Sequence, residues 1–166
     1  MKKQFANQHR TLESFGYEFL VICPNCQKQA TVLSKEAFPF IQNSNKRFVC
    51  THCGLTRDLI PKKNQAKQNI IVYQRTFREG MICIGGPFDW YYGYPLALQN
   101  PCCGKTLWAY NKEHLLYVKS YVEAEIRDNY SYYLSVESML PNWIKSAKNR
   151  KTIVKAITKL ERKLSI

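Results

Sequence analysis

The chain has 166 residues, a length that suits one domain or one domain with a small module, and it is 45% hydrophobic and 13% aromatic. This apolar content excludes a disordered polyelectrolyte, and no uninterrupted apolar run reaches the 18 residues of a membrane span. Lys and Arg exceed Asp and Glu by 13, with net charges of +8 in residues 1–80, −2 in 81–140 and +7 in 141–166. Basic ends favour a polyanionic partner because binding releases counterions, although lysine also keeps many soluble proteins in solution.

The first 60 residues predict short strands around two pairs of cysteines. Runs of β-branched, aromatic and other apolar residues, which are typical of strands, lie at 17–22, 30–33, 46–49 and 55–60. Cys23-Pro24-Asn25-Cys26 follows the first run, and Cys50-Thr51-His52-Cys53 follows the third. The two pairs therefore fall at the tips of two predicted hairpins, which is the layout of a zinc ribbon.

The cysteine spacing predicts a metal site. A two-residue gap lets both sulfurs of one turn converge on one ion, and two such turns complete a tetrahedral thiolate site from Cys23, Cys26, Cys50 and Cys53. We expect one structural Zn²⁺, with iron as the main rival, because a closed set of four thiolates leaves no position for a catalytic water. A redox dithiol or chance spacing is the alternative. His52 is expected to face solvent.

Residues 61–69 lack apolar periodicity and predict a linker between a zinc ribbon at 17–60 and a small α+β domain at 70–166. The second part begins with strand-like runs at residues 70–73, 80–84, 96–98 and 106–110. Asn111 is a suitable N-cap for a helix, residues 131–139 predict a short helix, and Asn149 is expected to cap a last helix from about Arg150. The predicted fold class is α+β: short antiparallel ribbon strands, then a small β-sheet and C-terminal amphipathic helices.

Several other features are open to more than one interpretation. The aromatic segment 88–95 suits a packed core, stacking on unpaired bases, or docking of a protein partner. Cys83, Cys102 and Cys103 are interpreted as small buried residues, because their spacing matches no standard metal pattern. No acid–base pair and no nucleophile with a partnering histidine can be argued, so we predict no catalytic residues and no enzyme activity.

Three further segments carry a resemblance to a known family. They are residues 92–96, 102–111 and 141–150. Together with the cysteine pairs, they resemble small bacterial transcription-factor-B-type zinc-ribbon proteins, some of which are labelled as like the primosomal replication-restart helicase. The resemblance implies little about activity, because those labels rest on the zinc ribbon. A helicase motor is not expected, since the chain is too short for one and has no Walker A loop. The chain departs from the usual pattern at Gln27, where glycine commonly follows the second cysteine.

We expect a cytoplasmic, non-catalytic protein that binds DNA or RNA, with no membrane partner and no small-molecule substrate. A protein–protein interaction adaptor is the alternative. The candidate nucleic-acid-binding residues are Lys46, Arg47, Arg57, Lys62, Lys63, Lys145, Lys148, Arg150, Lys151, Lys155 and Lys159. If the first five share a face with the terminal helix, nucleic acid is favoured, whereas a broad exposed aromatic patch favours a protein partner.

Overall fold

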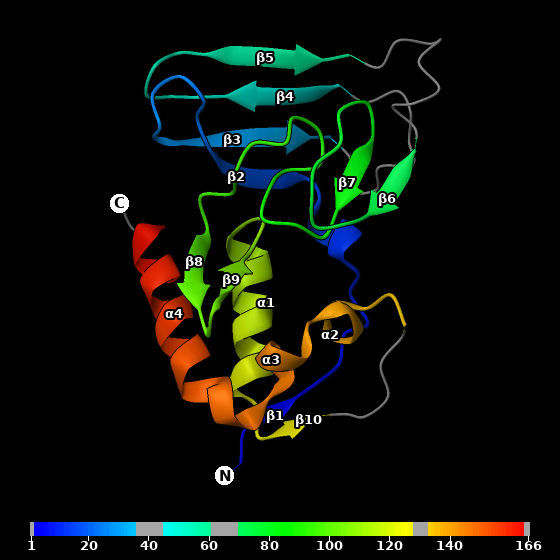
Figure 1. Ribbon diagram of the computed structural model, residues 1–166, viewed down its shortest axis with the longest axis vertical. Helices are drawn as coiled ribbons and strands as arrows, with labels where there is room; N and C mark the ends of the chain where they lie inside the picture. Colours follow the sequence, from blue (N-terminus) through cyan, green and yellow to red (C-terminus); the bar gives the residue numbers. More distant parts are fainter. Residues whose placement is uncertain (1, 36–44, 61–69, 128–132, 165–166) are drawn as a thin grey trace.

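The computed structural model describes residues 2–35, 45–60, 70–127 and 133–164, so the predicted linker at 61–69 lies outside the described residues. Antiparallel strands dominate the first part of the chain, and a helix ends the last described segment (Figure 1). The mixture of helix and strand agrees with the predicted fold class. The arrangement of the strands in the second half differs from the prediction.

The largest sheet is antiparallel, with the order β2-β3-β4-β5. Its strands are β2 (Glu18–Ile22), β3 (Gln29–Ser34), β4 (Lys46–Val49) and β5 (Thr56–Leu59). Phe19 pairs with Val32, and Val32 pairs with Phe48, so the three side chains lie on one face of the sheet. All three are fully buried, and this face therefore forms part of the core.

Residues from the second half of the chain cover the free edge of β2. The Leu20 N–H donates to the Tyr110 carbonyl oxygen, and the Leu20 carbonyl accepts from the Ala97 N–H, both at 2.8 Å. The Ile22 N–H donates to the Pro95 carbonyl oxygen, also at 2.8 Å. Strand β2 is thus hydrogen-bonded on one edge to β3 of the cysteine-bearing sheet and on its other edge to residues after position 70.

Outside the four-stranded sheet the described strands form separate pairs, one of them with the N-terminal β1, whereas the sequence predicted one small sheet in the second half of the chain. The pairs are β1 (Gln4–Phe5) with β10 (Ile126–Arg127), β6 (Ile71–Tyr73) with β7 (Ile82–Ile84), and β8 (Gln99–Cys102) with β9 (Lys105–Trp108). The predicted strand at 96–98 is buried but irregular. Leu96 donates its N–H to Pro87 while Ala97 donates to Leu20, so successive residues bond different segments and no continuous ladder forms.

The helices of the described residues are η1 (Leu12–Phe15), α1 (Lys112–Glu123), α2 (Val136–Met139), α3 (Asn142–Lys145), η3 (Ala147–Asn149) and α4 (Arg150–Lys163). Helices α1 to α4 lie in the lower half of the molecule in Figure 1, together with β8 and β9. Asn111 caps α1 as predicted, because its Oδ1 accepts the His114 N–H at 2.9 Å. Across the described residues, no helix has both the length and the apolar character that a membrane crossing requires.

Asn149 occupies the N-cap position of α4, as predicted, but its side chain forms no capping hydrogen bond. Asn149 lies in η3 with helical backbone angles, and its side chain donates to the Trp143 carbonyl oxygen at 2.8 Å without accepting a bond from α4. An N-cap residue needs extended backbone angles to turn its side chain towards the first N–H groups of the helix. The predicted helix at 131–139 begins, in its described part, at Val136.

The aromatic segment 88–95 packs into the core, which agrees with the first of its three interpretations. Phe88, Trp90 and Tyr91 are buried, and Trp90 meets Phe19 with ring centroids 4.9 Å apart. The loop is held by Asp89, whose buried carboxylate accepts backbone N–H groups from Tyr91, Tyr92 and Tyr94 at 2.7–2.8 Å. The rings and the cysteine-bearing sheet therefore share one core.

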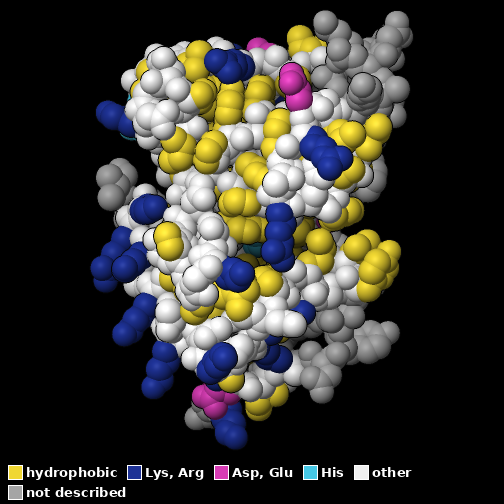
Figure 2. Space-filling view, in the orientation of Figure 1, with side chains coloured by type: hydrophobic (Ala, Val, Ile, Leu, Met, Phe, Trp, Pro, Cys, Tyr) yellow, Lys and Arg dark blue, Asp and Glu magenta, His cyan; other side chains and the backbone are white. Residues whose placement is uncertain are grey.

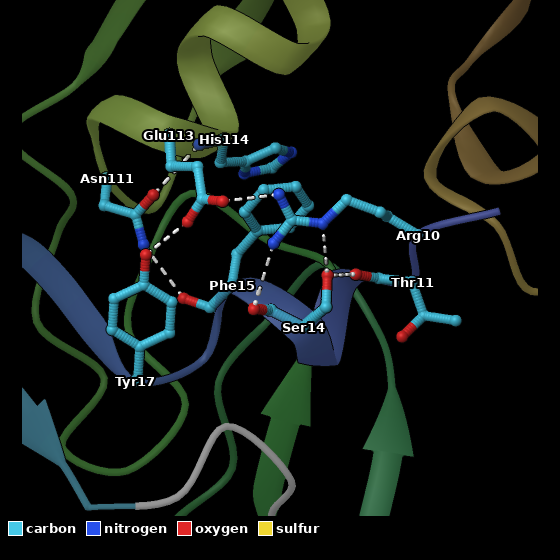
Figure 3. A network of polar contacts seen from close by, with 8 residues as sticks. All are labelled: Arg10, Thr11, Ser14, Phe15, Tyr17, Asn111, Glu113 and His114. Atoms are coloured by element: carbon cyan, nitrogen blue, oxygen red, sulfur yellow. Dashed lines mark hydrogen bonds and ion pairs between the residues drawn. The ribbon is translucent and has the colours of Figure 1, made fainter. Parts of the chain in front are cut away.

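A polar network joins the N-terminal segment to the start of α1 (Figure 3). Glu113 receives an ion pair from Arg10 and a hydrogen bond from the Tyr17 hydroxyl. The Asn111 amide donates to the Phe15 carbonyl oxygen at 2.9 Å. The Arg10 guanidinium also lies 3.9 Å from the centre of the Phe15 ring. These contacts fix η1 against α1.

Candidate metal centre and basic surface

The four predicted cysteine ligands lie together. The Sγ atoms of Cys23, Cys26, Cys50 and Cys53 are all within 4.8 Å of one another. Cys23 and Cys53 are 3.7 Å apart at sulfur, and Cys26 and Cys50 are 3.6 Å apart. The first pair lies in the turn between β2 and β3, and the second pair lies in the turn between β4 and β5. Antiparallel pairing of the two hairpins brings both turns to the same side of the sheet (Figure 1).

The two turns have matching backbone geometry. The Gln27 N–H donates to the Cys23 carbonyl oxygen at 3.0 Å, and the Gly54 N–H donates to the Cys50 carbonyl oxygen at 2.9 Å. Gln27 has φ of 61° and Gly54 has φ of 74°, so each turn ends in the left-handed region. The turn at Gln27 therefore has the same form as the turn at Gly54, although Gln27 departs from the glycine expected there.

Nearby polar groups act on the two more accessible thiols. A side-chain hydrogen bond from Asn25 and a backbone hydrogen bond from Leu55 lower the pKa of Cys53 to about 6. A backbone hydrogen bond from Lys28 acts in the same direction at Cys26, but desolvation and the neighbouring cysteine thiols outweigh it and raise that pKa to about 11. The backbone N–H groups that follow each turn are thus directed at sulfur, where they stabilise thiolates that bind a metal.

The donor set fits a metal ion. For a tetrahedral ion with metal–sulfur bonds of about 2.3 Å, the sulfurs are separated by about 3.8 Å, which is close to the two shortest separations in this cluster. Cys23 and Cys50 are buried, whereas Cys53 is exposed, so an ion could enter from the outer side of the cluster. The structure confirms that the four cysteines predicted as ligands lie together, in a group that could hold a metal ion.

The remaining cysteines and His52 lie apart from this cluster. His52 is exposed, as predicted. Cys83 and Cys102 are buried, which agrees with their interpretation as small core residues, but Cys103 is exposed. Cys103 occupies the β8–β9 turn with φ of 53°, and its Sγ lies 3.7 Å from the Sγ of the buried Cys102.

Lys46 does not belong to the exposed basic surface. Only 5% of this residue is accessible, and its ammonium donates to the Ser34 hydroxyl at 2.8 Å. The ammonium also lies 5.1 Å from the centre of the Tyr91 ring. The alternation of β4 explains the difference, because Lys46 and Phe48 lie on the same buried face and Arg47 lies on the other.

The other predicted residues near the metal cluster have partners or lie outside the described residues. Arg47 is exposed and forms an ion pair with Asp58 at 3.6 Å. Arg57 is exposed, donates to the Tyr94 hydroxyl and has its guanidinium carbon 5.9 Å from that ring. Lys62 and Lys63 lie outside the described residues.

Helix α4 presents an exposed row of basic side chains, which we call the α4 basic face. Its members are Lys151, Lys155, Lys159 and Arg162. They recur at helical spacing opposite the buried Ile153 and Ile157, as predicted. Figure 2 shows Lys and Arg side chains projecting along the edge of the molecule where Figure 1 places α4.

The α4 basic face is not neutralised by acidic neighbours. Glu161 is the single acidic residue of α4, and its carboxylate is held by Lys119 of α1 at 2.8 Å. Among the described residues, no carboxylate lies within 4.0 Å of a cation of this face. Four unpaired positive charges therefore extend along roughly 17 Å of one helix at 1.5 Å per residue.

The basic residues before α4 differ in accessibility. Lys148 is exposed beside the first turn of the helix. Lys145 is half-buried and donates to the Ser138 carbonyl oxygen at 3.0 Å. Arg150 is half-buried, and its enclosed Nε has no hydrogen-bond partner within the described segments. The sequence correctly predicted that the basic residues of α4 are exposed. It could not show that Lys148 is exposed whereas Lys145 and Arg150 are half-buried.

Among the described residues, the exposed cations of β4 and β5, Arg47 and Arg57, do not share a face with α4, so the arrangement that would favour nucleic acid over a protein partner is not observed for them. Figure 1 places β4 and β5 at one end of the molecule and α4 in the opposite half.

The sequence did not indicate three groups at the metal cluster, namely the Asn25 side chain and the backbone N–H groups of Lys28 and Leu55. No sequence signal identifies them, because they act through the folded turn.

Comparison with models of known protein families, with curated protein sequences and with solved structures found no significant match. The interpretation of this chain therefore rests on its own residues.

Proposed function

We propose that the four cysteines bind one Zn²⁺ and that this ion has a structural role in a zinc ribbon. The support is the closed thiolate donor set and the two matching turns that present it. Four sulfurs fill the tetrahedral coordination of zinc, so no site is left for a water or substrate. When bound, the ion would join the β2–β3 and β4–β5 turns, and the chain itself would supply the N–H groups that stabilise the thiolates.

The metal proposal is tested by cobalt titration, because tetrahedral Co²⁺–thiolate complexes absorb strongly in the visible region. We expect one Co²⁺ per chain, displaced by one Zn²⁺. Cys26→Ser should weaken the absorbance and the affinity, whereas Cys103→Ala, which changes an exposed cysteine outside the cluster, should leave both unchanged. A full-strength spectrum from the Cys26→Ser variant would contradict the ligand set.

We further propose that the protein binds nucleic acid without catalysis and that the α4 basic face contacts phosphates. The single observation that carries this proposal is the row of exposed cations on α4 without acidic partners. A polyanion gains free energy on such a surface through counterion release, and the other side of the helix is buried, so the charges are held in fixed register. The separation of the β4–β5 cations from α4 restricts the proposed contact surface to α4 and Lys148.

The binding proposal is tested with labelled single- and double-stranded DNA and RNA at one low salt concentration. Reversing Lys151, Lys155 and Lys159 to Glu should weaken binding at least 100-fold. The matched control reverses Lys2, Lys35 and Arg78, which are exposed and lie outside α4 and its neighbour α1, and changes the net charge equally. Equal weakening in the two variants would contradict a localised phosphate-binding face, and unchanged binding in the α4 variant would favour the protein-adaptor alternative.

A further inference from the structure

A cavity of about 340 Å³ opens between β9, α1 and the α2–α3 segment, away from the metal cluster. Its walls are mostly apolar and include the rings of Trp108 and Trp143 together with Val118 and Ile144. The volume lies at the lower end of the range for small-molecule sites, about 300–1,000 Å³. The space therefore suits a ligand with one ring or two fused rings.

Two basic residues from different parts of the chain line this cavity. Arg75 follows β6 and Lys105 begins β9, and both residues are exposed and line the cavity. No Asp or Glu lines it, and within the described residues neither cation has an ion-pair partner. Figure 2 shows a hollow on this face with hydrophobic side chains in it and Lys and Arg side chains at its edge. The electrostatic setting favours an anionic group at the mouth.

A buried histidine supplies a third polar group. His114 lines the cavity with 2% of its surface accessible, and its Nδ1 accepts the Tyr110 N–H at 3.2 Å. Burial and, secondarily, the charge of Arg10 lower the pKa of this imidazole to about 3, so the ring is neutral at pH 7. The proton of the neutral ring is then on Nε2, which has no acceptor among the described residues.

The orientation of this imidazole is fixed. Its ring stacks on Phe15 with centroids 4.9 Å apart, and Trp108 meets it edge-on at 5.7 Å (Figure 3 shows the imidazole beside Phe15). The polar network around Glu113 holds Phe15 and η1 in place. A donor that is held rigidly in a mostly apolar cavity gives directional recognition of a ligand.

We propose that this cavity binds a small anion with a flat apolar body, such as an aromatic phosphate or carboxylate. The anionic group would lie between Arg75 and Lys105, and the ring would contact Trp108 and Trp143. The Nε2–H of His114 would donate to a polar atom on the ring. This site is independent of the α4 basic face, and it revises the expectation that no small molecule binds.

The test uses the full chain with zinc and the fluorescent probe 1-anilinonaphthalene-8-sulfonate, which has an apolar aromatic body and one anionic group. We expect one site, from which phenyl phosphate displaces the probe while the same concentration of inorganic phosphate does not. Replacing both Arg75 and Lys105 by Ala should weaken phenyl phosphate at least 10-fold. The matched control replaces Arg78 and Lys112, which are exposed and do not line the cavity, and should bind as the wild type does.

The neutral analogue N-phenyl-1-naphthylamine separates loss of charge recognition from loss of the cavity. Its affinity should be the same in the wild type and in the Arg75→Ala/Lys105→Ala variant, because the apolar walls are retained. Parallel loss of both probes in this variant would overturn the proposal, as would displacement by inorganic phosphate alone or undiminished phenyl phosphate binding. Thr106→Trp, which places a ring at the cavity wall, should weaken both probes, and unchanged binding of both would locate the site elsewhere.

Discussion

Gln27 and Gly54 occupy equivalent positions after the two cysteine pairs, but they meet the same backbone requirement at different cost. Both have positive φ, and a Cβ added at Gly54 would meet no atom within 4 Å. A change of side chain there therefore acts through backbone conformation alone. A residue other than glycine in this region costs about 1 kcal/mol.

We predict that Gly54→Ala lowers the free energy of unfolding by about 1 kcal/mol and that Gln27→Gly raises it by about 0.5 kcal/mol. The smaller gain reflects the greater freedom of glycine in the unfolded chain and the removal of the weak Gln27–Pro24 side-chain hydrogen bond. Urea unfolding with zinc in fixed excess measures both values. If both substitutions destabilised the chain equally, the two turns would not share one backbone requirement.

His114 makes stability depend on pH in a defined direction. Its folded pKa is about 3 and its ordinary value is 6.5, so the unfolded chain binds more protons between these values. Stability is therefore fully present above about pH 6.5 and falls as the pH falls through this window. Asp89 acts oppositely, because burial raises its pKa to about 6 despite its backbone hydrogen bonds, and the folded form then binds the additional proton.

We predict that His114→Asn removes about 2 kcal/mol of the stability change between pH 7 and pH 5. The asparagine Oδ1 can replace Nδ1 as the acceptor for the Tyr110 N–H, whereas its amide does not titrate. Urea unfolding of both proteins at the two pH values gives the difference, from which the contribution of Asp89 cancels. An identical pH dependence in wild type and variant would mean that folding does not lower the pKa of His114.

Helices, strands and caps that depend on nearby residues were predicted better than the pairing between strands. The strand at Lys46–Val49 and the cap at Asn111 follow from alternation and from capping chemistry within a few residues. The cysteine site was also predictable, because its two-residue spacings encode the turns. Residues 96–98 were misassigned as a strand, since their backbone partners at Pro87 and Leu20 lie far away in sequence.

Whether a charged side chain is exposed or buried was harder to predict than the helical repeat of such side chains. The exposed lysines of α4 follow from a 3.6-residue repeat, which sequence alone displays. The burial of Lys46 depends on Ser34 and Tyr91, which come from β3 and a later loop. The cavity combines residues from segments that lie far apart in the sequence, from Leu12 to Ile144, so no single motif indicated it.

At the scale of the whole molecule, the predicted domains at 17–60 and 70–166 share a core. Phe19 of β2 contacts Trp90 and Tyr110, with ring centroids 4.9 and 5.1 Å apart. The edge of β2 is also bonded to Pro95, Ala97 and Tyr110. The domain boundary at 61–69 remains a prediction. A fragment that contains only one of the two parts would lose the contacts that the other part makes in the shared core.

We predict that the fragment 70–166 alone melts at a lower temperature and less cooperatively than the whole chain. Without β2 it would expose the rings of Trp90 and Tyr110 to water, and it would lack the partners of three backbone hydrogen bonds. Thermal circular dichroism at near-ultraviolet wavelengths measures the transition, and adding the fragment 1–60 with zinc should restore it in part. A fragment that melts as the whole chain does would establish an independent domain.

The salt dependence of nucleic-acid binding is the most direct measure of phosphate contact by the α4 basic face. If the α4 basic face contacts phosphates, the logarithm of the association constant should fall linearly with the logarithm of the salt concentration. The Lys151→Glu/Lys155→Glu/Lys159→Glu variant should have a slope shallower by about 2–3, or about 0.7–0.9 for each phosphate that the protein no longer neutralises. Its thermal stability should be nearly unchanged, because these lysines are exposed. Wild-type binding that does not respond to salt, or equal slopes for the two proteins, would contradict the account.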